Sequence, residues 1–194
     1  MITVRWLNGD PEEDIISAAA ATAGKAFMAR CDIERMIRAE HSPIHEAVLR
    51  IEDDACRSDV VSHLVRHTKG HPRHYVQSFR PDLTGKPRPT DPAAPRWYAS
   101  SWPVDALLAM ARQRLCSRAA GPTGAWVSDI RDQLLDQGGL MGIVARHMVP
   151  ACEYRGGCPE GRACCGRMLR LDCLLDHRAA LRSDTAGLYQ RGTE

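Results

Sequence analysis

Apolar residues recur with a strand period in two short parts of this chain and with a helical period in most of the rest. ITVRWL predicts a strand over residues 2–7, and the alternation after the turn at Pro43 predicts a second strand over 47–52. The segments with helical spacing are 15–39, 58–65, 104–119, 125–136, 139–148 and 168–182. We therefore expect an α/β or α+β fold, with helices packed on a small mixed or antiparallel sheet.

Three segments lack either period. Residues 81–103 are rich in Pro, which lacks a backbone N–H donor, so we expect a loop or an extended connecting segment there. The Gly- and Cys-rich sequence CEYRGGCPEGRACCGR predicts a further loop, and the polar residues 183–194 predict a frayed tail. At 194 residues without an internal repeat, the chain is expected to form a single domain over 1–194.

Composition excludes some classes of function. The net charge is only +2, which argues against binding nucleic acid through the charge of the whole molecule. No apolar run approaches the ~18 residues that a membrane span requires. The N-terminal residues lack the basic-then-apolar order of a signal peptide, and we expect a cytoplasmic protein.

Eight cysteines are many for a chain of this length, and in a reducing compartment they are more often thiols or metal ligands than disulfides. Five of them lie near the C-terminus: Cys152, Cys158, Cys164, Cys165 and Cys173. Structural zinc takes four ligands in a tetrahedron, often in pairs separated by two residues, and that close spacing is missing. We expect no metal site, with a zinc-bound Cys loop as the alternative.

Basic residues are concentrated in SHLVRHTKGHPRHYVQSFR, residues 62–80, which contains four His, three Arg, one Lys and no acid. Arginine presents a planar fork of donors that engages phosphate oxygens in pairs, and histidine adds donors near neutral pH. The stretch is thus suited to a phosphate ligand. It is also compatible with a solvated basic loop, or with a single-stranded nucleic-acid site in which Tyr75 and Phe79 stack on bases.

Three motifs in this order resemble those of the flavin-dependent thymidylate synthase family. Arg66-His67 and Ser78-Phe79-Arg80 resemble the family signature of Arg-His-Arg, a short spacer and Ser-x-Arg. Upstream, EHSPIHEAVLRIE resembles its Thr/Ser-Pro-Phe-Glu-His turn and strand, and downstream VDALLAMARQRLC resembles its helix ending in Leu-Arg. The likeness covers about residues 10–120.

The chain departs from this pattern at several positions. The third signature residue is Thr68, the spacer is two residues longer, and the Glu-His pair appears as His45-Glu46. The Asn that usually precedes the Leu-Arg helix is absent. These features resemble a shortened branch of the family found in phages and in nucleoside-antibiotic pathways, and the Arg- and Ala-rich composition favours the antibiotic pathway.

The resemblance implies a reaction and its partners. It implies C5-methylation of a uracil nucleotide, UMP or dUMP or both, with carbon from 5,10-methylenetetrahydrofolate, hydride from reduced FAD, and NADPH to re-reduce the flavin. It also implies the fold of that family and a homotetramer with shared active sites, with no membrane or nucleic-acid partner. The alternative is a nucleic-acid-binding module with a metal-bound Cys loop.

The resemblance also implies roles for individual residues. The cofactor-binding positions are Ser42, His45, Arg66 and His67, and the substrate-binding positions are His63, Ser78, Arg80 and Arg114. Arg66 would bridge flavin and nucleotide and Arg114 would contact the uracil ring, so these two are the catalytic candidates. Ser78 and Arg80 would hold the nucleotide phosphate. In the spacer, solvent or phosphate contacts are expected for His71, Arg73 and His74.

Overall fold

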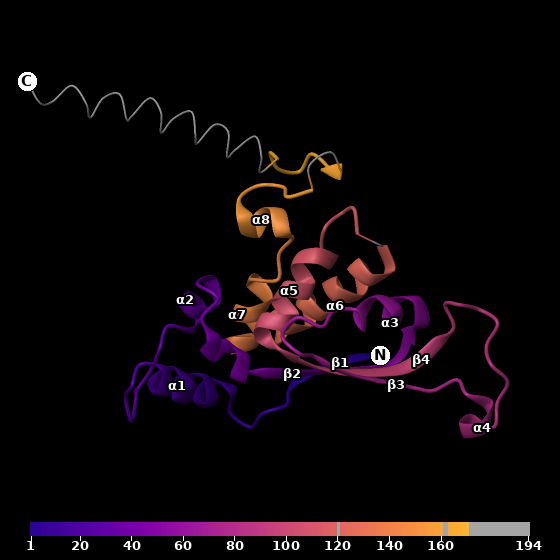
Figure 1. Cartoon of the computed structure of the whole chain (residues 1–194), viewed down its shortest axis with the longest axis horizontal. Helices are drawn as coiled ribbons and strands as arrows, with labels where there is room; N and C mark the ends of the chain where they lie inside the picture. Colours follow the sequence, from indigo (N-terminus) through magenta and orange to yellow (C-terminus); the bar gives the residue numbers. More distant parts are fainter. Residues whose placement is uncertain (120, 161–162, 171–194) are drawn as a thin grey trace, which may run out of the picture.

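A four-stranded antiparallel sheet forms the base of the protein in the computed structural model, which describes residues 1–119, 121–160 and 163–170 (Figure 1). The strands lie in the order β1, β2, β4, β3, with bounds β1 Ile2–Trp6, β2 Val48–Arg57, β4 Pro95–Pro103 and β3 Arg73–Val76. Both strands predicted from the sequence are present, and the predicted fold class is confirmed.

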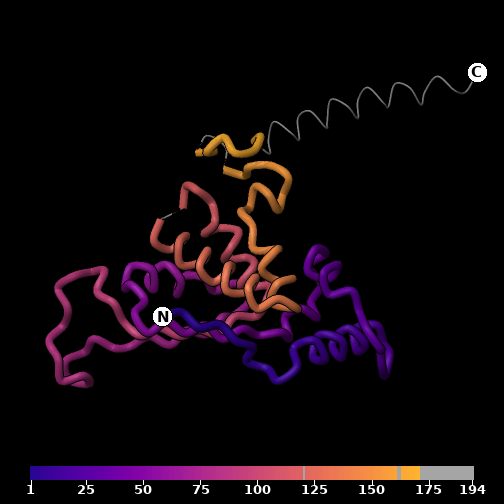
Figure 2. The backbone as a smooth tube through the Cα atoms, turned by 180° about the vertical axis from the view of Figure 1, so that it is seen from behind, coloured from indigo at the N-terminus to yellow at the C-terminus, as the bar shows by residue number. Residues whose placement is uncertain are grey.

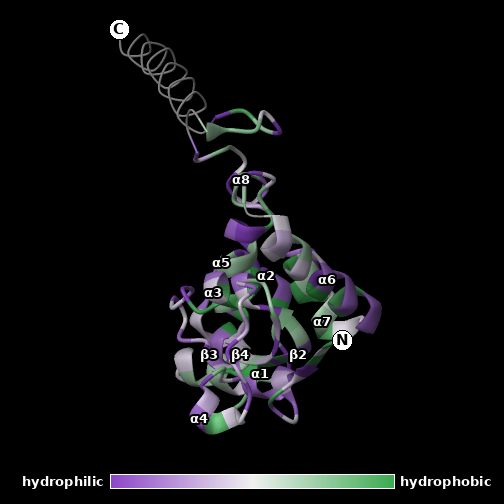
Figure 3. Ribbon diagram, turned by 90° about the vertical axis from the view of Figure 1, so that its right-hand side faces the viewer, coloured by the Kyte–Doolittle hydropathy of each residue, from purple (hydrophilic) through white to green (hydrophobic). Residues whose placement is uncertain are grey.

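Helices α3, α5, α6 and α7 lie together on one side of the sheet (Figure 1). Their bounds are α3 Ser58–Leu64, α5 Val104–Arg114, α6 Gly121–Gln137 and α7 Gly139–Arg146, close to the predicted ranges. Along β2 buried and less buried residues alternate over Val48–Asp53, which places Leu49 and Ile51 in the core. Figure 3 shows the hydrophobic residues concentrated where these helices meet the sheet.

The single helix predicted over 15–39 is wrong. The structure has α1 at Pro11–Thr22 and α2 at Ile33–Arg38, separated by ten residues that are not helical. The chain leaves α1 through Gly24, which has φ of +66°. A new helix then begins because the Asp32 carboxylate accepts the Arg35 N–H as an N-cap.

The Pro-rich segment 81–103 was also predicted incorrectly as a connection throughout. Its second half is β4, which pairs with both β2 and β3 inside the sheet. Pro95 and Pro103 stand at the two ends of the strand, where a missing N–H is tolerated, and Tyr98 and Trp102 between them are fully buried. Only the first half, which contains the single turn α4 (Pro81–Thr84), connects strands.

Two segments project from this body (Figure 2). The connection between β3 and β4 extends beyond one end of the sheet, and α8 (Ala151–Arg155) with the Cys-rich loop stands above the helices. Of the predicted helix over 168–182, residues 168–170 are not helical, and the remainder lies outside the described residues, as does the 183–194 tail. No helix in the described part of the chain is long and apolar enough to cross a membrane.

Candidate active site

A hydrogen bond between two predicted site residues is the centre of the candidate site. Arg114, in the last turn of α5, donates its Nε–H to Nε2 of His67, which follows α3, over 2.8 Å. Arginine is protonated at any ordinary pH, so Nε2 of His67 is the acceptor and the ring proton lies on Nδ1. Burial, and then the charge of Arg114, lowers the pKa of His67 to about 4. His67 is therefore neutral at pH 7.

Two further histidines of the basic stretch are fixed beside His67 by residues of α6 and β4. His63 Nδ1 lies 2.8 Å from Thr123 Oγ1, and His74 Nδ1 lies 2.8 Å from the Tyr98 hydroxyl. Both lower the pKa of His67 further by their charge. The histidines thus form one cluster, held from several elements.

For His74 the sequence predicted solvent or phosphate contacts, and a phosphate contact stays a prediction. His74 lies in β3, is half-buried, and its ring centroid is 5.2 Å from that of Trp102 in an edge-on contact. Burial lowers the pKa of His74. Successive side chains of a strand point to opposite faces of the sheet, and this places His74 on the face with Trp102. The sequence around His74 did not predict a strand, so this direction was not foreseen.

Arg66 supplies a positive charge at the edge of the cluster. Its side chain is exposed, and within the described ranges no carboxylate lies at ion-pair distance from it. Burial and the charge of Arg66 lower the pKa of Arg114. Two arginines that repel each other beside the neutral imidazole of His67 form a site suited to an anionic ligand.

A polar cleft of about 330 Å³ lies next to the 3₁₀ helix η1 (Ser42–Glu46). His45 donates Nδ1–H to Asp105 Oδ1 over 2.9 Å, and the cleft is also lined by Asn8, His71, Arg73 and Ser101, among others. The exposed residue Ser42 begins this helix. The structure therefore brings His45 together with the spacer residues His71 and Arg73. These residues are more than twenty positions apart from His45, so the sequence alone did not indicate that they are neighbours.

Gly70 attaches the loop after His67 to α5. Its φ is +75°, and a Cβ at this position would stand 2.6 Å from Ala106 Cβ and 3.3 Å from Asp105 Oδ2. Only glycine allows this approach without displacement of the backbone. The contact holds the loop between His67 and the His45–Asp105 pair.

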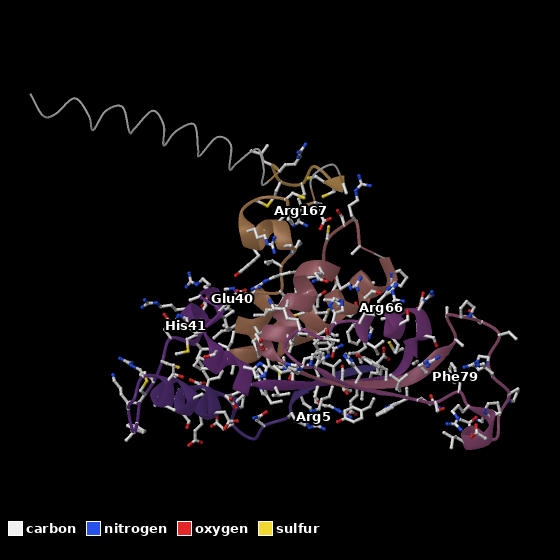
Figure 4. All side chains as sticks on the ribbon, viewed as in Figure 1. Arg5, Glu40, His41, Arg66, Phe79 and Arg167 are labelled. Atoms are coloured by element: carbon white, nitrogen blue, oxygen red, sulfur yellow. The ribbon has the colours of Figure 1, made fainter. Side chains whose placement is uncertain are left out.

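Ser78 and Arg80 do not join this cluster within the chain. They precede α4 on the projecting connection, where Figure 4 labels Phe79, whereas Arg66 is labelled on the helix side of the sheet. Arg80 pairs with the nearby Asp82, and its backbone N–H donates to Ser78 Oγ over 3.1 Å. Among the described residues, no hydrogen bond or ion pair joins Ser78 or Arg80 to His67 or Arg114, so the predicted phosphate-binding residues and the His67–Arg114 pair are separate within the chain.

Sequence reasoning missed the residues that orient the predicted ones. Thr123, Tyr98 and Asp105 position His63, His74 and His45 respectively. The only feature of the sequence that pointed to Asp105 was its place as an acid in the first turn of the helix over 104–114. No feature of the sequence pointed to Thr123. Within the described residues, no group of three or more His, Cys, Asp or Glu is arranged to hold a metal ion, and Cys173 lies outside them.

The architecture is the ThyX fold. Thymidylate synthase X from Helicobacter pylori, solved with FAD and dUMP, aligns with a TM-score of 0.52 at 11% identity, over 68% of this chain and 92% of that one. The UMP/dUMP methylase PolB from Streptomyces cacaoi is also similar. Its complex with 5-bromo-dUMP gives a TM-score of 0.55 at 12% identity, over 76% of this chain and 94% of that one.

The PolB complex with 5-bromo-UMP gives a TM-score of 0.53 at 11% identity, over 76% and 93% of the two chains. At these identities the comparisons establish the fold that the three sequence motifs predict. No family model and no curated protein matches the sequence.

Proposed function

We propose that this protein is a flavin-dependent C5-methylase of a uracil nucleotide, UMP or dUMP, of the thymidylate synthase X type. The observation that carries the proposal is the neutral His67 held by Arg114 beside the exposed Arg66, on a ThyX fold. The motif residues that sequence resemblance assigns to flavin and uracil are in contact here, although 47 positions separate them.

The residues present fit FAD, which would supply the hydride when bound. A flavin dinucleotide has a planar apolar ring and two phosphates. His67 offers a neutral, half-buried ring, and Arg66 offers a guanidinium without a carboxylate partner among the described residues. His45 lines the cleft and Ser42 begins the same 3₁₀ helix, and we propose that these two residues hold the cofactor together with Arg66 and His67.

Arg114 is the group suited to polarise the uracil. Its Nε is bound to His67, which fixes the plane of the guanidinium and leaves the two terminal nitrogens for a ligand. Donors already oriented toward a carbonyl oxygen stabilise the negative charge that develops there as C5 becomes nucleophilic. His63, held by Thr123, stands in the same cluster as a nucleotide contact.

The separation of Ser78 and Arg80 from this cluster supports a site shared between subunits. Arg80 is exposed, its one ion pair is with Asp82 two residues away, and the segment projects from the body. In a homotetramer such a segment can deliver a phosphate-binding arginine to a neighbouring copy. We propose that Ser78 and Arg80 hold the nucleotide phosphate in this way.

The remaining reactants follow from the same reaction class. Methylenetetrahydrofolate would supply the carbon and NADPH the reducing equivalents. We propose a role in nucleoside-antibiotic biosynthesis, which would require that UMP is accepted as well as dUMP. The longer spacer between Arg66 and Ser78, which here includes β3, is the segment we propose to admit the 2′-hydroxyl.

The alternative of a nucleic-acid-binding module has less support. Its two stacking candidates are occupied, because Arg50 lies 4.8 Å over the Tyr75 ring and Arg96 lies 4.0 Å over the Phe79 ring. One face of each ring is thus covered by an arginine, which leaves less aromatic surface for stacking on bases.

Flavin titration tests the proposal directly. We expect the purified protein to bind FAD, and Arg66→Gln to weaken that binding at least tenfold. The matched control is Arg131→Gln, a partly exposed arginine of α6 paired with Asp132, and this variant should bind FAD normally. Absence of FAD binding together with salt-dependent oligonucleotide binding would instead support the alternative.

A further inference from the structure

A second basic pocket, of about 470 Å³, lies beyond the C-terminal end of α5. The turn after α5 forms one wall, and α8 with the Cys-rich loop forms the other. Its lining includes four arginines and a single acid, namely Arg112, Arg114, Arg118, Arg155 and Glu160. Such an excess of positive charge around a concave surface favours the binding of an anion.

Two of these arginines are already engaged by the protein. Arg112 pairs with Glu40 and lies 3.4 Å over the Tyr154 ring, and Arg114 donates to His67. Arg118 and Arg155 are different, because both are exposed and neither has a carboxylate at ion-pair distance in the part of the chain that the structure describes. Their guanidinium forks are therefore available to a ligand.

A cysteine in the wall lies close to Arg118. Cys165 lines the pocket, and its pKa is lowered first by a hydrogen bond from Ser117, then by the Arg167 N–H, and least by the charge of Arg118. The charge of Arg118 therefore acts on this part of the wall. Cys165 is exposed, so it is also open to chemical labelling.

Arg114 connects this pocket with the candidate active site. It lines the pocket and donates to His67, so a ligand that occupies the pocket lies next to a residue of the candidate active site. A long substrate could therefore place one end near Arg114 and the other between Arg118 and Arg155.

We infer that this pocket binds the anionic tail of a second substrate, a phosphate or carboxylate group held by Arg118 and Arg155. The existence of the anion site stands on the pocket alone, whereas its assignment to a substrate rests on the proposed function. The proposed reaction has two such tails, the glutamyl carboxylates of the folate donor and the 2′-phosphate of NADPH. Both match the paired donors of arginine.

Binding of pyrophosphate tests the anion site without any need for catalysis. We expect calorimetry to detect pyrophosphate binding to the full chain, and bound pyrophosphate to slow alkylation of Cys165 by iodoacetamide at least fivefold, followed by peptide mass spectrometry. The double variant Arg118→Gln/Arg155→Gln should bind at least tenfold more weakly. Arg118→Lys/Arg155→Lys should retain part of the binding because it keeps the charge, and Arg131→Gln should bind like the original protein.

Equal pyrophosphate affinity in the double Gln variant, with its circular dichroism unchanged, would overturn the anion site. To assign the tail, KM is compared for NADPH against NADH and for mono- against triglutamylated methylenetetrahydrofolate. We expect the double Gln variant to lose either the preference for NADPH over NADH or the preference for the triglutamylated over the monoglutamylated folate. If both preferences persist while pyrophosphate binding is lost, the assignment to a substrate tail is overturned. FAD binding, measured in parallel, reports separately on the proposed function.

Discussion

The hydrogen bond between Arg114 and His67 sets the protonation state of the candidate site. Because an arginine Nε always carries its proton, the bond persists only while Nε2 of His67 is unprotonated. Protonation of His67 would place two cations in contact in a half-buried position. The hydrogen bond from Arg114 and the low pKa of His67 therefore depend on each other.

His67 should titrate near pH 4 in the folded protein, measured from its ring proton signals by NMR. In the unfolded chain it titrates near its ordinary value of about 6.5. Between these values the unfolded state binds a proton that the folded state does not, so stability is full above pH 6.5 and falls as the pH drops toward 4. Between pH 7 and 5 we expect His67→Gln to lose about 1 kcal/mol less unfolding free energy than the original protein. Partial exposure of His67 makes this difference smaller than the pKa shift alone would give. A midpoint above 6 would contradict the arrangement.

Arg114→Gln should reduce kcat by about a hundredfold, since it removes a donor aimed at developing charge. It should also raise the pKa of His67 only in part, because burial is the larger cause of the shift. Arg131→Gln serves as the control for loss of a partly exposed arginine outside the site. If Arg114→Gln leaves both kcat and the pKa of His67 unchanged, Arg114 does not belong to the active site.

At the scale of elements, the loop after His67 depends on its close approach to α5. Gly70→Ala should destabilise the protein by about 3 kcal/mol, because the new methyl meets Ala106 and the left-handed backbone is strained. Gly85→Ala is the matched control, with φ of +66° and open space around the position, and should cost about 1 kcal/mol. Urea unfolding gives both values, and equal losses would mean that the loop does not need this contact.

The sequence predicted elements well where one local signal dominated, and poorly where two signals conflicted. The motif residues Arg66, His67 and Arg114 were proposed from the sequence, but the contact between His67 and Arg114 has no local signature, because it depends on how α3 and α5 each pack against α6. β4 was missed because prolines at its ends outweighed the strand between them. α1 and α2 were merged because an Ala-rich composition concealed the break at Gly24 and the cap at Asp32.

At the scale of the whole molecule, our proposal that Arg80 serves the site of a neighbouring copy makes assembly part of the proposed function. We expect light scattering to show a homotetramer. Arg66→Gln and Arg80→Gln subunits, each poorly active alone at low nucleotide concentration, should recover activity when unfolded together and reassembled. If each site takes Arg66 from one subunit and Arg80 from another, half times half of the sites, roughly a quarter, are intact.

No recovery in such hybrids, with tetramers formed, would place Arg80 in the site of its own subunit or outside any site. A monomer with full activity would contradict the shared site altogether. The Arg131→Gln variant mixed with Arg80→Gln controls for dilution of the inactive subunits.

Tritium release from [5-³H]UMP and [5-³H]dUMP, with FAD, NADPH and methylenetetrahydrofolate present, tests the central claim most directly. Replacement of the C5 hydrogen by a methyl group must liberate the label as water. We predict release from at least one of the two nucleotides, dependent on FAD and on the folate, and lost in Arg114→Gln. Release from neither nucleotide by a protein that binds FAD would contradict the proposal that this fold and this histidine–arginine site carry out C5-methylation.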